Sequence, residues 1–136
     1  MEPGIILKSI LHRNLPYLGH NKEANEIIDI EEYMEIIRSK KFTASLPWGS
    51  MKIANMNGIT TKLHWANEPY RWHVNEGEEV FAVLDGMVEM QYMKDGVVHT
   101  SLLNQGDIFY ANEGTEHVAS PVGEARILVV ETEGSI

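Results

Sequence analysis

The chain has 136 residues, the size of one domain, and 43% of them are hydrophobic, which is enough to fill a single core. Its formal net charge of −9 at pH 7 repels phosphate backbones and anionic lipid, so we expect neither a nucleic acid nor a membrane as partner. It contains no cysteine, which excludes disulfides and thiolate chemistry and agrees with a cytoplasmic location.

The first part of the chain gives mixed signals. Its start lacks a basic segment followed by a long apolar run, so no signal peptide is expected. Ile5–Ser9 is a candidate edge strand, and Asn14–Asn25 is predicted to be a loop because it is polar and contains proline and glycine. We expect residues 1–41 to form an N-terminal arm that packs on the rest of the chain.

One short helix is predicted over Ile30–Lys40. Asp29 is a candidate N-cap, and Glu32 three residues later completes a capping box. Apolar side chains then follow at helical spacing, namely Ile30, Met34 and Ile37. These signals together predict a helix of two to three turns.

From residue 42 onward the sequence is typical of short antiparallel strands, with turn signals about every eight to twelve residues. Three pairs of turn residues are predicted to close hairpins: Asn57–Gly58, Asp85–Gly86 and Asp95–Gly96. The expected strands are Met51–Met56, Ile59–Trp65, Arg71–Asn75, Glu79–Leu84, Met87–Met93, Val97–Leu103, Gly106–Ala111, Glu116–Ser120 and Ala125–Glu131. Residues 42–136 are therefore predicted to form an all-β antiparallel sandwich or barrel, within a single domain overall.

Two histidines and a carboxylate occupy the strands of this predicted barrel. Alternation along a strand puts His73 and Asn75 on one face, and Glu79 begins the next strand. His117 follows a glycine-containing turn far downstream and can meet them from a neighbouring strand. Imidazole nitrogens and a carboxylate oxygen are ligands of divalent transition metals, so the sequence predicts a metal site inside the barrel.

The residues around His73 also resemble the first motif of the cupin superfamily, G-x5-H-x-H-x(3,4)-E-x6-G. The chain matches it at His73, Glu79 and Gly86, whereas Asn75 stands at the second histidine position and Asn67 at the opening glycine. The change at Asn75 affects chemistry, because a neutral amide oxygen replaces an imidazole there.

The second cupin motif, G-x5-P-x-G-x2-H-x3-N, is matched at Gly106, Gly114 and His117. Asn112 replaces its turn proline, and Pro121 replaces its terminal asparagine. Two motifs in the right order with fitting gaps are more specific than either alone. The resemblance covers residues 51–131.

The resemblance implies a double-stranded β-helix, that is, an antiparallel jelly-roll barrel of the RmlC-like type, together with the arm and the short helix. It also implies a homodimer. Carried over residue by residue, it gives His73, Glu79 and His117 as metal ligands and leaves Asn75 as a weak fourth ligand or a substrate contact. The ligand types suit Zn²⁺, Fe²⁺, Mn²⁺, Ni²⁺ or Cu²⁺ without choosing among them.

Further candidates for substrate binding come from strand alternation. His64 and Lys62 share one face of a strand and contact the substrate if that face lines the pocket. The alternative is a solvated face, because antiparallel sheets often leave one side wet. Tyr92 shares a face with Val88 and Met90 and is expected beside the site as a substrate contact. The tryptophans are expected to pack in the core or in a dimer interface: Trp48, Trp65 and Trp72.

The leading functional hypothesis is a metal-dependent enzyme of small-molecule metabolism, with a small polar substrate in the barrel. Oxygenase, isomerase and decarboxylase chemistry are all compatible with the resemblance. One alternative is a non-catalytic cupin that binds a small ligand. Another is a metal-free sugar epimerase or isomerase that uses His73 or His117 as general base.

Overall fold

A computed structural model describes residues 28–30 and 34–135 of the chain. The chain divides into two compact units, Met1–Phe42 and Thr43–Ile136. The predicted packing of the N-terminal arm on the barrel stays a prediction. Within the described residues, no helix is both long and apolar enough to cross a membrane.

The first unit contains a small antiparallel sheet where the sequence predicts a helix. Its strands are β1 (Ile28–Ile30) and β2 (Glu35–Ile37), and the short 3-10 helix η2 (Ser39–Lys41) follows. The predicted helix over Ile30–Lys40 is therefore wrong in its described part. The predicted strand and loop further upstream lie outside the described residues.

The reason for this difference is the isoleucine content of the segment. Ile28 pairs with Ile37 across the two strands, and Ile30 pairs with Glu35. A β-branched side chain has a restricted χ1 angle, which disfavours helix slightly and suits the pleated surface of a sheet. Cross-strand pairing of isoleucines therefore outweighs the capping signal at Asp29.

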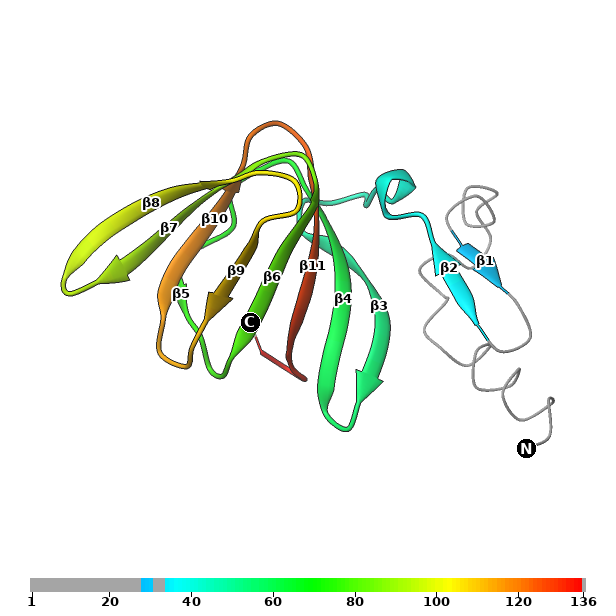
Figure 1. Cartoon of the computed structure of the whole chain (residues 1–136), viewed down its shortest axis with the longest axis horizontal. Coiled ribbons are helices and arrows are strands. Elements are labelled where there is room, and N and C mark those ends of the chain that lie inside the picture. Colours follow the sequence, from blue (N-terminus) through cyan, green and yellow to red (C-terminus); the bar gives the residue numbers. More distant parts are fainter. Residues whose placement is uncertain (1–27, 31–33, 136) are drawn as a thin grey trace. The chain divides into compact units, whose positions relative to one another are not determined.

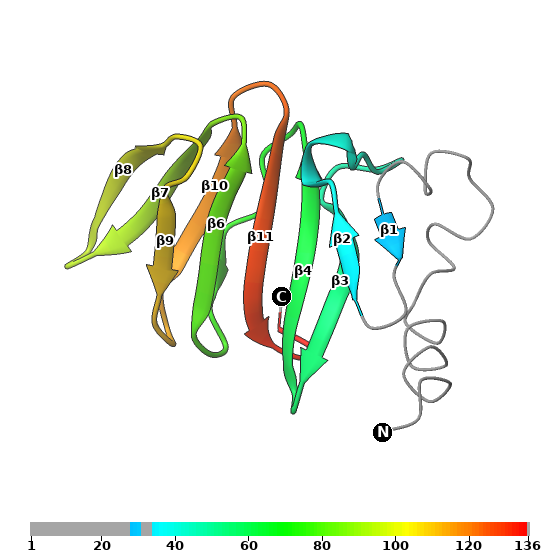
Figure 2. The same cartoon turned by 45° about the vertical axis from the view of Figure 1, so that its right-hand side comes forward.

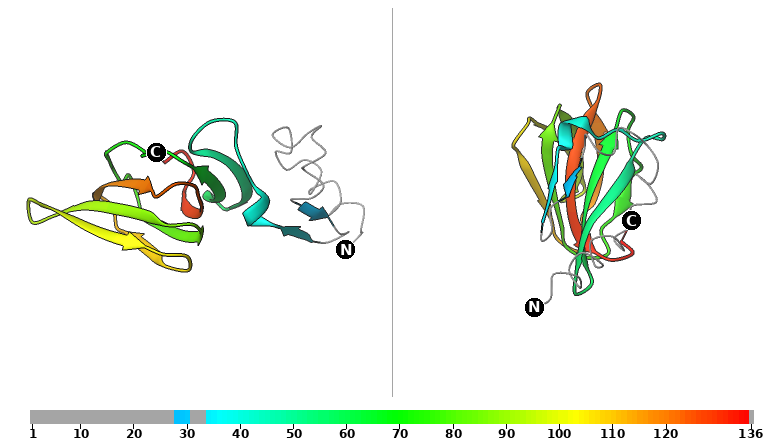
Figure 3. Two further views of the ribbon diagram at one scale, coloured as in Figure 1. Left: turned by 90° about the horizontal axis from the view of Figure 1, so that it is seen from above. Right: turned by 90° about the vertical axis from the view of Figure 1, so that its right-hand side faces the viewer.

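The second unit consists of two antiparallel sheets that face each other (Figures 1 and 3). The larger sheet has the order β3-β4-β11-β6-β9, and its strands lie side by side in Figure 2. They are β3 (Gly49–Met56), β4 (Ile59–Ala66), β11 (Ala125–Thr132), β6 (Glu79–Asp85) and β9 (Ile108–Ala111). The smaller sheet has the order β5-β10-β7-β8. Its strands are β5 (His73–Val74), β10 (Glu116–Pro121), β7 (Val88–Lys94) and β8 (Val97–Leu103). The predicted all-β antiparallel jelly roll is confirmed.

Two of the three predicted hairpins are present. Asn57–Gly58 joins β3 to β4 with φ angles of 56° and 87°, and Asp95–Gly96 joins β7 to β8 with φ angles of 53° and 73°. Positive φ at both central residues is what a two-residue hairpin turn requires. The matching asparagine, aspartate and glycine residues therefore set the register of both hairpins.

The predicted hairpin at Asp85–Gly86 is wrong, because β6 and β7 belong to different sheets. In the described residues, positive φ outside glycine is confined to Trp48, Asn57 and Asp95, so the hairpin geometry is absent at Asp85. Gly86 instead has a φ of 82°, and a Cβ atom there would overlap the carbonyl oxygen of Glu124. The turn thus carries the chain from one sheet to the other beneath a closely packed loop.

The hydrophobic core lies between the inner faces of the two sheets. Its buried members are Ala66, Phe81, Val83, Val88, Met90, Leu103, Ala119, Ala125, Ile127 and Val129. Along β6 and β11, alternation pairs Val83 with Ile127 and Phe81 with Val129 on this face. The next inward pair is Glu79 with Glu131, so the apolar core gives way to polar groups at one end of the same face.

Candidate metal centre

Three residues predicted as metal ligands meet at the polar end of the barrel. His73 on β5 lies directly across from His117 on β10, and their ring centroids are 4.4 Å apart. Glu79 reaches them from β6 of the opposite sheet. One donor atom from each residue lies within 4.8 Å of the other two. Bonds of about 2.0–2.2 Å from a single divalent ion can draw such a set together.

The ring of His73 is held in the orientation that a metal ligand needs. Its Nδ1 lies 2.9 Å from the backbone oxygen of Arg71. A carbonyl oxygen only accepts hydrogen bonds, so this contact requires the proton on Nδ1 and leaves the lone pair of Nε2 free. The same outer contact fixes the tautomer of histidines in known metal sites.

Glu79 and His117 are buried in direct contact. Nε2 of His117 lies 3.4 Å from Oε1 of Glu79, and only 2% and 8% of the two side chains are exposed. Burial raises the pKa of Glu79, but the hydrogen bond and charge of His117, together with His73, outweigh it and hold the pKa below its usual value. Nδ1 of His117 is buried without a hydrogen-bond partner among the described residues. Two imidazoles and an ionised carboxylate with open positions are a donor set that fits a divalent transition metal.

Asn75 is buried next to these residues but does not line the cavity that they border. Its backbone N–H donates to the backbone oxygen of Thr115 at 3.0 Å, and its backbone carbonyl oxygen accepts from the N–H of Gly114 at 2.9 Å. These bonds tie β5 to the turn before β10 and so help to align His73 with His117. The predicted roles of Asn75 as fourth ligand or substrate contact stay predictions.

A cavity of about 190 Å³ opens beside the cluster. Lys62 and His64 are among the residues that line it, and their contact with a substrate stays a prediction. Nδ1 of His64 lies 3.3 Å from the oxygen of Trp48. Burial lowers the pKa of His64, and the nearby charge of Lys62 acts in the same direction, against the hydrogen bond to Trp48. His64 is therefore a neutral polar group at the cavity wall.

Aromatic rings form another part of this wall. The rings of Trp48 and Tyr70 are 5.2 Å apart, and Tyr70 meets His73 edge-on at 5.3 Å. Trp48 has a φ of 62°, which is rare for a bulky residue, and its Nε1 donates to the oxygen of Glu68 at 2.7 Å. Trp48 lines the cavity, although the sequence favoured packing in the core or in a dimer interface for this residue. Tyr70 also lines the cavity, and no sequence signal marked it.

Glu131 is a second carboxyl group in the site that the sequence interpretation missed. It lies directly across from Glu79 and lines the same cavity. Burial raises the pKa of Glu131 to about 7, and the charge of Glu79 and a hydrogen bond between the two carboxyl groups add to this rise. Alternation would have found this residue, because Ala125, Ile127 and Val129 precede it on the inward face.

Tyr92 is not brought to the cavity. It lies across from His117 on β7, but its ring stacks on His99 at 5.6 Å and packs against the core. Its predicted contact with a substrate stays a prediction. Val88 and Met90, predicted to share its face, are fully buried in the core.

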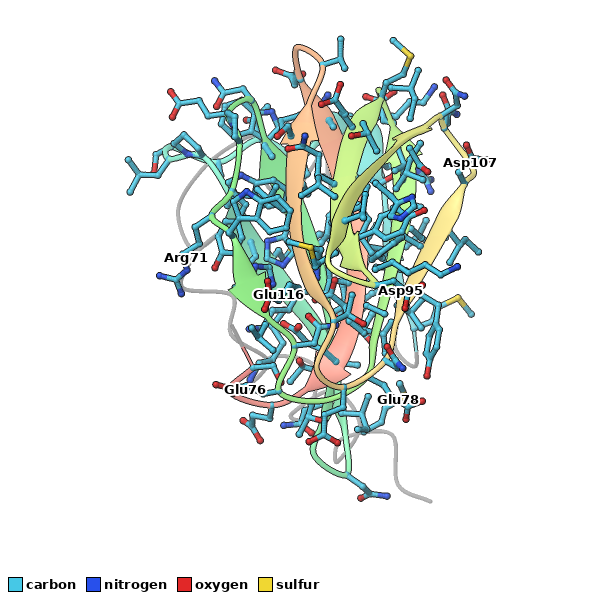
Figure 4. All side chains as sticks on the ribbon, turned by 90° about the vertical axis from the view of Figure 1, so that its left-hand side faces the viewer. Arg71, Glu76, Glu78, Asp95, Asp107 and Glu116 are labelled. Carbon is cyan, nitrogen blue, oxygen red and sulfur yellow. The ribbon has the colours of Figure 1, made fainter. Side chains whose placement is uncertain are left out.

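Charged residues near the ligands in sequence lie on the outside of the barrel. Glu76, Glu78 and Glu116 are exposed, and Figure 4 shows Glu76 and Glu78 toward the lower end of the barrel. Glu78 accepts a hydrogen bond from Tyr110 at 2.6 Å. Strand alternation thus separates exposed Glu78 from its buried neighbour Glu79.

Comparison with known proteins gives structural likenesses alone. No protein-family model matches the sequence, and no curated protein matches it at a significant level. A cupin-2 domain protein from Shewanella frigidimarina matches with a TM-score of 0.59 and 25% identity over 66% of this chain and 85% of that one. A cupin superfamily protein from Desulfitobacterium hafniense matches with a TM-score of 0.59 and 14% identity over 70% and 86%. A hydroquinone 1,2-dioxygenase in complex with Cd²⁺ and 4-hydroxybenzonitrile matches with a TM-score of 0.57 and 16% identity over 66% and 67%.

Proposed function

The chain has the cupin superfamily fold, and we propose that it is a metal-dependent enzyme of small-molecule metabolism whose ion is held by His73, Glu79 and His117. The convergence of three donor atoms within 4.8 Å beside a cavity carries this proposal. The Cd²⁺ in the structurally similar hydroquinone dioxygenase supports it further.

The groups around the proposed ion suit catalysis on a small polar substrate. A bound divalent ion polarises a substrate oxygen or lowers the pKa of a bound water. The contact with Arg71 keeps the His73 ring oriented, and Glu131 offers a carboxyl group beside Glu79 that can hold a proton near neutral pH. Trp48 and Tyr70 supply aromatic surface to the cavity wall. Oxygenase, isomerase and decarboxylase chemistry all remain compatible with this arrangement.

Metal binding by the full-length protein tests the proposal. We expect close to one Zn²⁺ per chain by elemental analysis, and His73→Ala or His117→Ala should weaken the affinity measured by calorimetry. The loss should exceed the roughly 10- to 100-fold that removal of an outer-shell partner costs. Unchanged stoichiometry and affinity in both variants would rule out the site.

Matched controls separate ligand loss from general damage. His99→Ala removes an exposed imidazole outside the cluster and should leave zinc binding unchanged. Glu79→Gln should weaken zinc binding, whereas Glu78→Gln, one residue away on the exposed face, should not. Equal losses in Glu78→Gln and Glu79→Gln would contradict the assignment of Glu79.

A metal-free epimerase or isomerase is the second candidate. The 3.4 Å contact between His117 and Glu79 favours it, because a carboxylate can orient an imidazole that acts as general base. Activity that is lost in His117→Ala but unaffected by chelators would support this candidate. The non-catalytic binding module, the homodimer and the cytoplasmic location also remain predictions.

A further inference from the structure

Lys62 is a charged residue of the cavity that the proposed metal site does not use. It lies in β4 and lines the cavity with a partly buried side chain. Among the residues that the structure describes, none forms an ion pair or hydrogen bond with its ammonium group. The charges close to it belong to Glu131 and, when protonated, His64.

Sheet stability does not explain a lysine at this place. Lys62 lies directly across from Lys52 on β3, and like charges in a cross-strand pair destabilise a sheet. Lys52 has a counter-charge, since its Nζ lies 4.0 Å from a carboxylate oxygen of Glu133. Within the described part of the chain, Lys62 has no ion pair of this kind, so a ligand that carries a negative charge would stabilise its partly buried ammonium group.

The register of the sheet sets the distance between Lys62 and the metal ligands. Lys62 pairs with Val129 on β11, which pairs with Phe81 on β6, the strand that carries Glu79. Neighbouring strands are about 4.8 Å apart, so Lys62 starts about 10 Å from the strand of Glu79. A molecule in the cavity can therefore reach the ammonium at one end and the three ligands at the other.

The size of the cavity limits what this molecule can be. Its volume of 190 Å³ is somewhat larger than the roughly 150 Å³ that holds benzene in another protein. The wall of Trp48 and Tyr70 offers flat apolar contacts. Among the described residues that line the cavity, Lys62 is the only lysine or arginine and stands beside two carboxyl groups, which favours a ligand with a single negative charge over a phosphate dianion.

We propose that the substrate is a small monocarboxylate whose carboxylate binds Lys62. A further oxygen atom of this molecule, outside the carboxylate, faces His73, Glu79 and His117. The inference rests on the proposed function, because it takes the ligand cluster as the reactive end of the cavity. It assigns Lys62 as the residue that determines specificity for an acid over a neutral molecule of the same shape.

Acids paired with their neutral amides test this assignment on the full-length, zinc-loaded protein. The probes are para-hydroxybenzoate, mandelate and lactate, each compared by calorimetry with para-hydroxybenzamide, mandelamide and lactamide. At least one acid should bind about tenfold more tightly than its amide, the effect of one charge-assisted hydrogen bond. If no acid exceeds its amide, the proposal is wrong.

Variants of the lysines identify the group responsible. Lys62→Met should bring acid and amide to within about twofold, whereas Lys62→Arg should keep the preference because it keeps the charge. Lys52→Met removes the same charge from the facing residue and should also keep the preference for the acid. If Lys62→Met does not fold, as judged by circular dichroism, Lys62→Gln takes its place. A preference for the acid that survives loss of the Lys62 charge overturns the proposal.

The zinc content of every sample distinguishes a failure of the role assigned to Lys62 from a failure of the proposed function. Normal zinc content without a preference for acids contradicts the role of Lys62 and leaves the metal site intact. Absence of zinc from the wild-type protein contradicts the proposed function. The acid and amide comparison is therefore repeated on chelator-treated protein, where a preference that depends on Lys62 still supports the anion site.

Discussion

Glu131 on β11 lies directly across from Glu79 on β6, and both carboxyl groups border the cavity. Two carboxylates in such a pair repel each other, so one of them retains a proton to a higher pH. Contact with His117 keeps Glu79 ionised, and Glu131 therefore holds the proton. The strand register places the two carboxyl groups side by side, and burial of Glu131 together with the contact between Glu79 and His117 decides which of them holds the proton.

This pair makes the stability of the chelator-treated protein depend on pH. The pKa of Glu131 rises from 4.5 to about 7 on folding, so the folded protein binds more protons than the unfolded chain between these values. The stability that Glu131 contributes is complete below about pH 4.5 and is lost as the pH rises through about 7. Glu79 faces this group with a lowered pKa, and its contribution is lost only as the pH falls below 4.5.

Comparison with Glu131→Gln isolates the effect of Glu131. Urea denaturation of both chelator-treated proteins across the same pH range should show wild-type stability falling relative to the variant as the pH rises. Subtracting the two pH profiles also cancels the contribution of His64 to the stability. The pKa of His64 is lowered, so this contribution is lost as the pH falls below 6.5. Parallel pH profiles of wild type and variant would contradict a raised pKa at Glu131.

Gly86→Ala should destabilise the barrel by more than about 1 kcal/mol in urea denaturation. The new Cβ would sit at a φ of 82° and overlap the backbone of Glu124, which cannot move as a flexible side chain can. Gly96→Ala is the matched control, because Gly96 has a φ of 73° but open space around it. If the two variants lose the same stability, the close approach of Gly86 to Glu124 does not contribute to the loss.

Trp48→Ala should lower stability by about 2–3 kcal/mol, through loss of the ring contact with Tyr70 and of the hydrogen bond to Glu68. Trp72→Ala provides the comparison, since 46% of Trp72 is exposed and a loss below about 1 kcal/mol is expected there. Thermal or urea unfolding followed by circular dichroism measures both. A smaller effect at Trp48 than at Trp72 would show that Trp48 is not held in place by its neighbours.

The barrel was predictable from sequence because its signals are local. Asn57–Gly58 and Asp95–Gly96 tolerate positive φ and fix two hairpins, and alternation along β6 and β11 marks the inward face. The convergence of His73, Glu79 and His117 was accessible through their resemblance to two motifs. Hydrophobic alternation then determined which neighbours of these residues face the solvent.

The errors arose where tertiary pairing decides between local alternatives. Pairing of Ile28 with Ile37 overrides a capping signal, and no local pattern reveals it. Whether Asp85–Gly86 closes a hairpin or crosses between sheets depends on the loop that packs against Gly86. Lys62 faces the cavity because it pairs with Val129 on the inward face of β11, and a polar strand face does not reveal that pairing by itself.

The position of a bound ion in crystals of the zinc-loaded protein tests the central claim most directly. Diffraction data collected at the zinc absorption edge should give one strong anomalous peak with bonds of about 2.0–2.2 Å to a ring nitrogen of His73, a ring nitrogen of His117 and a carboxylate oxygen of Glu79. A strongest peak away from these residues, or no peak among them in crystals that contain zinc, would contradict the metal centre.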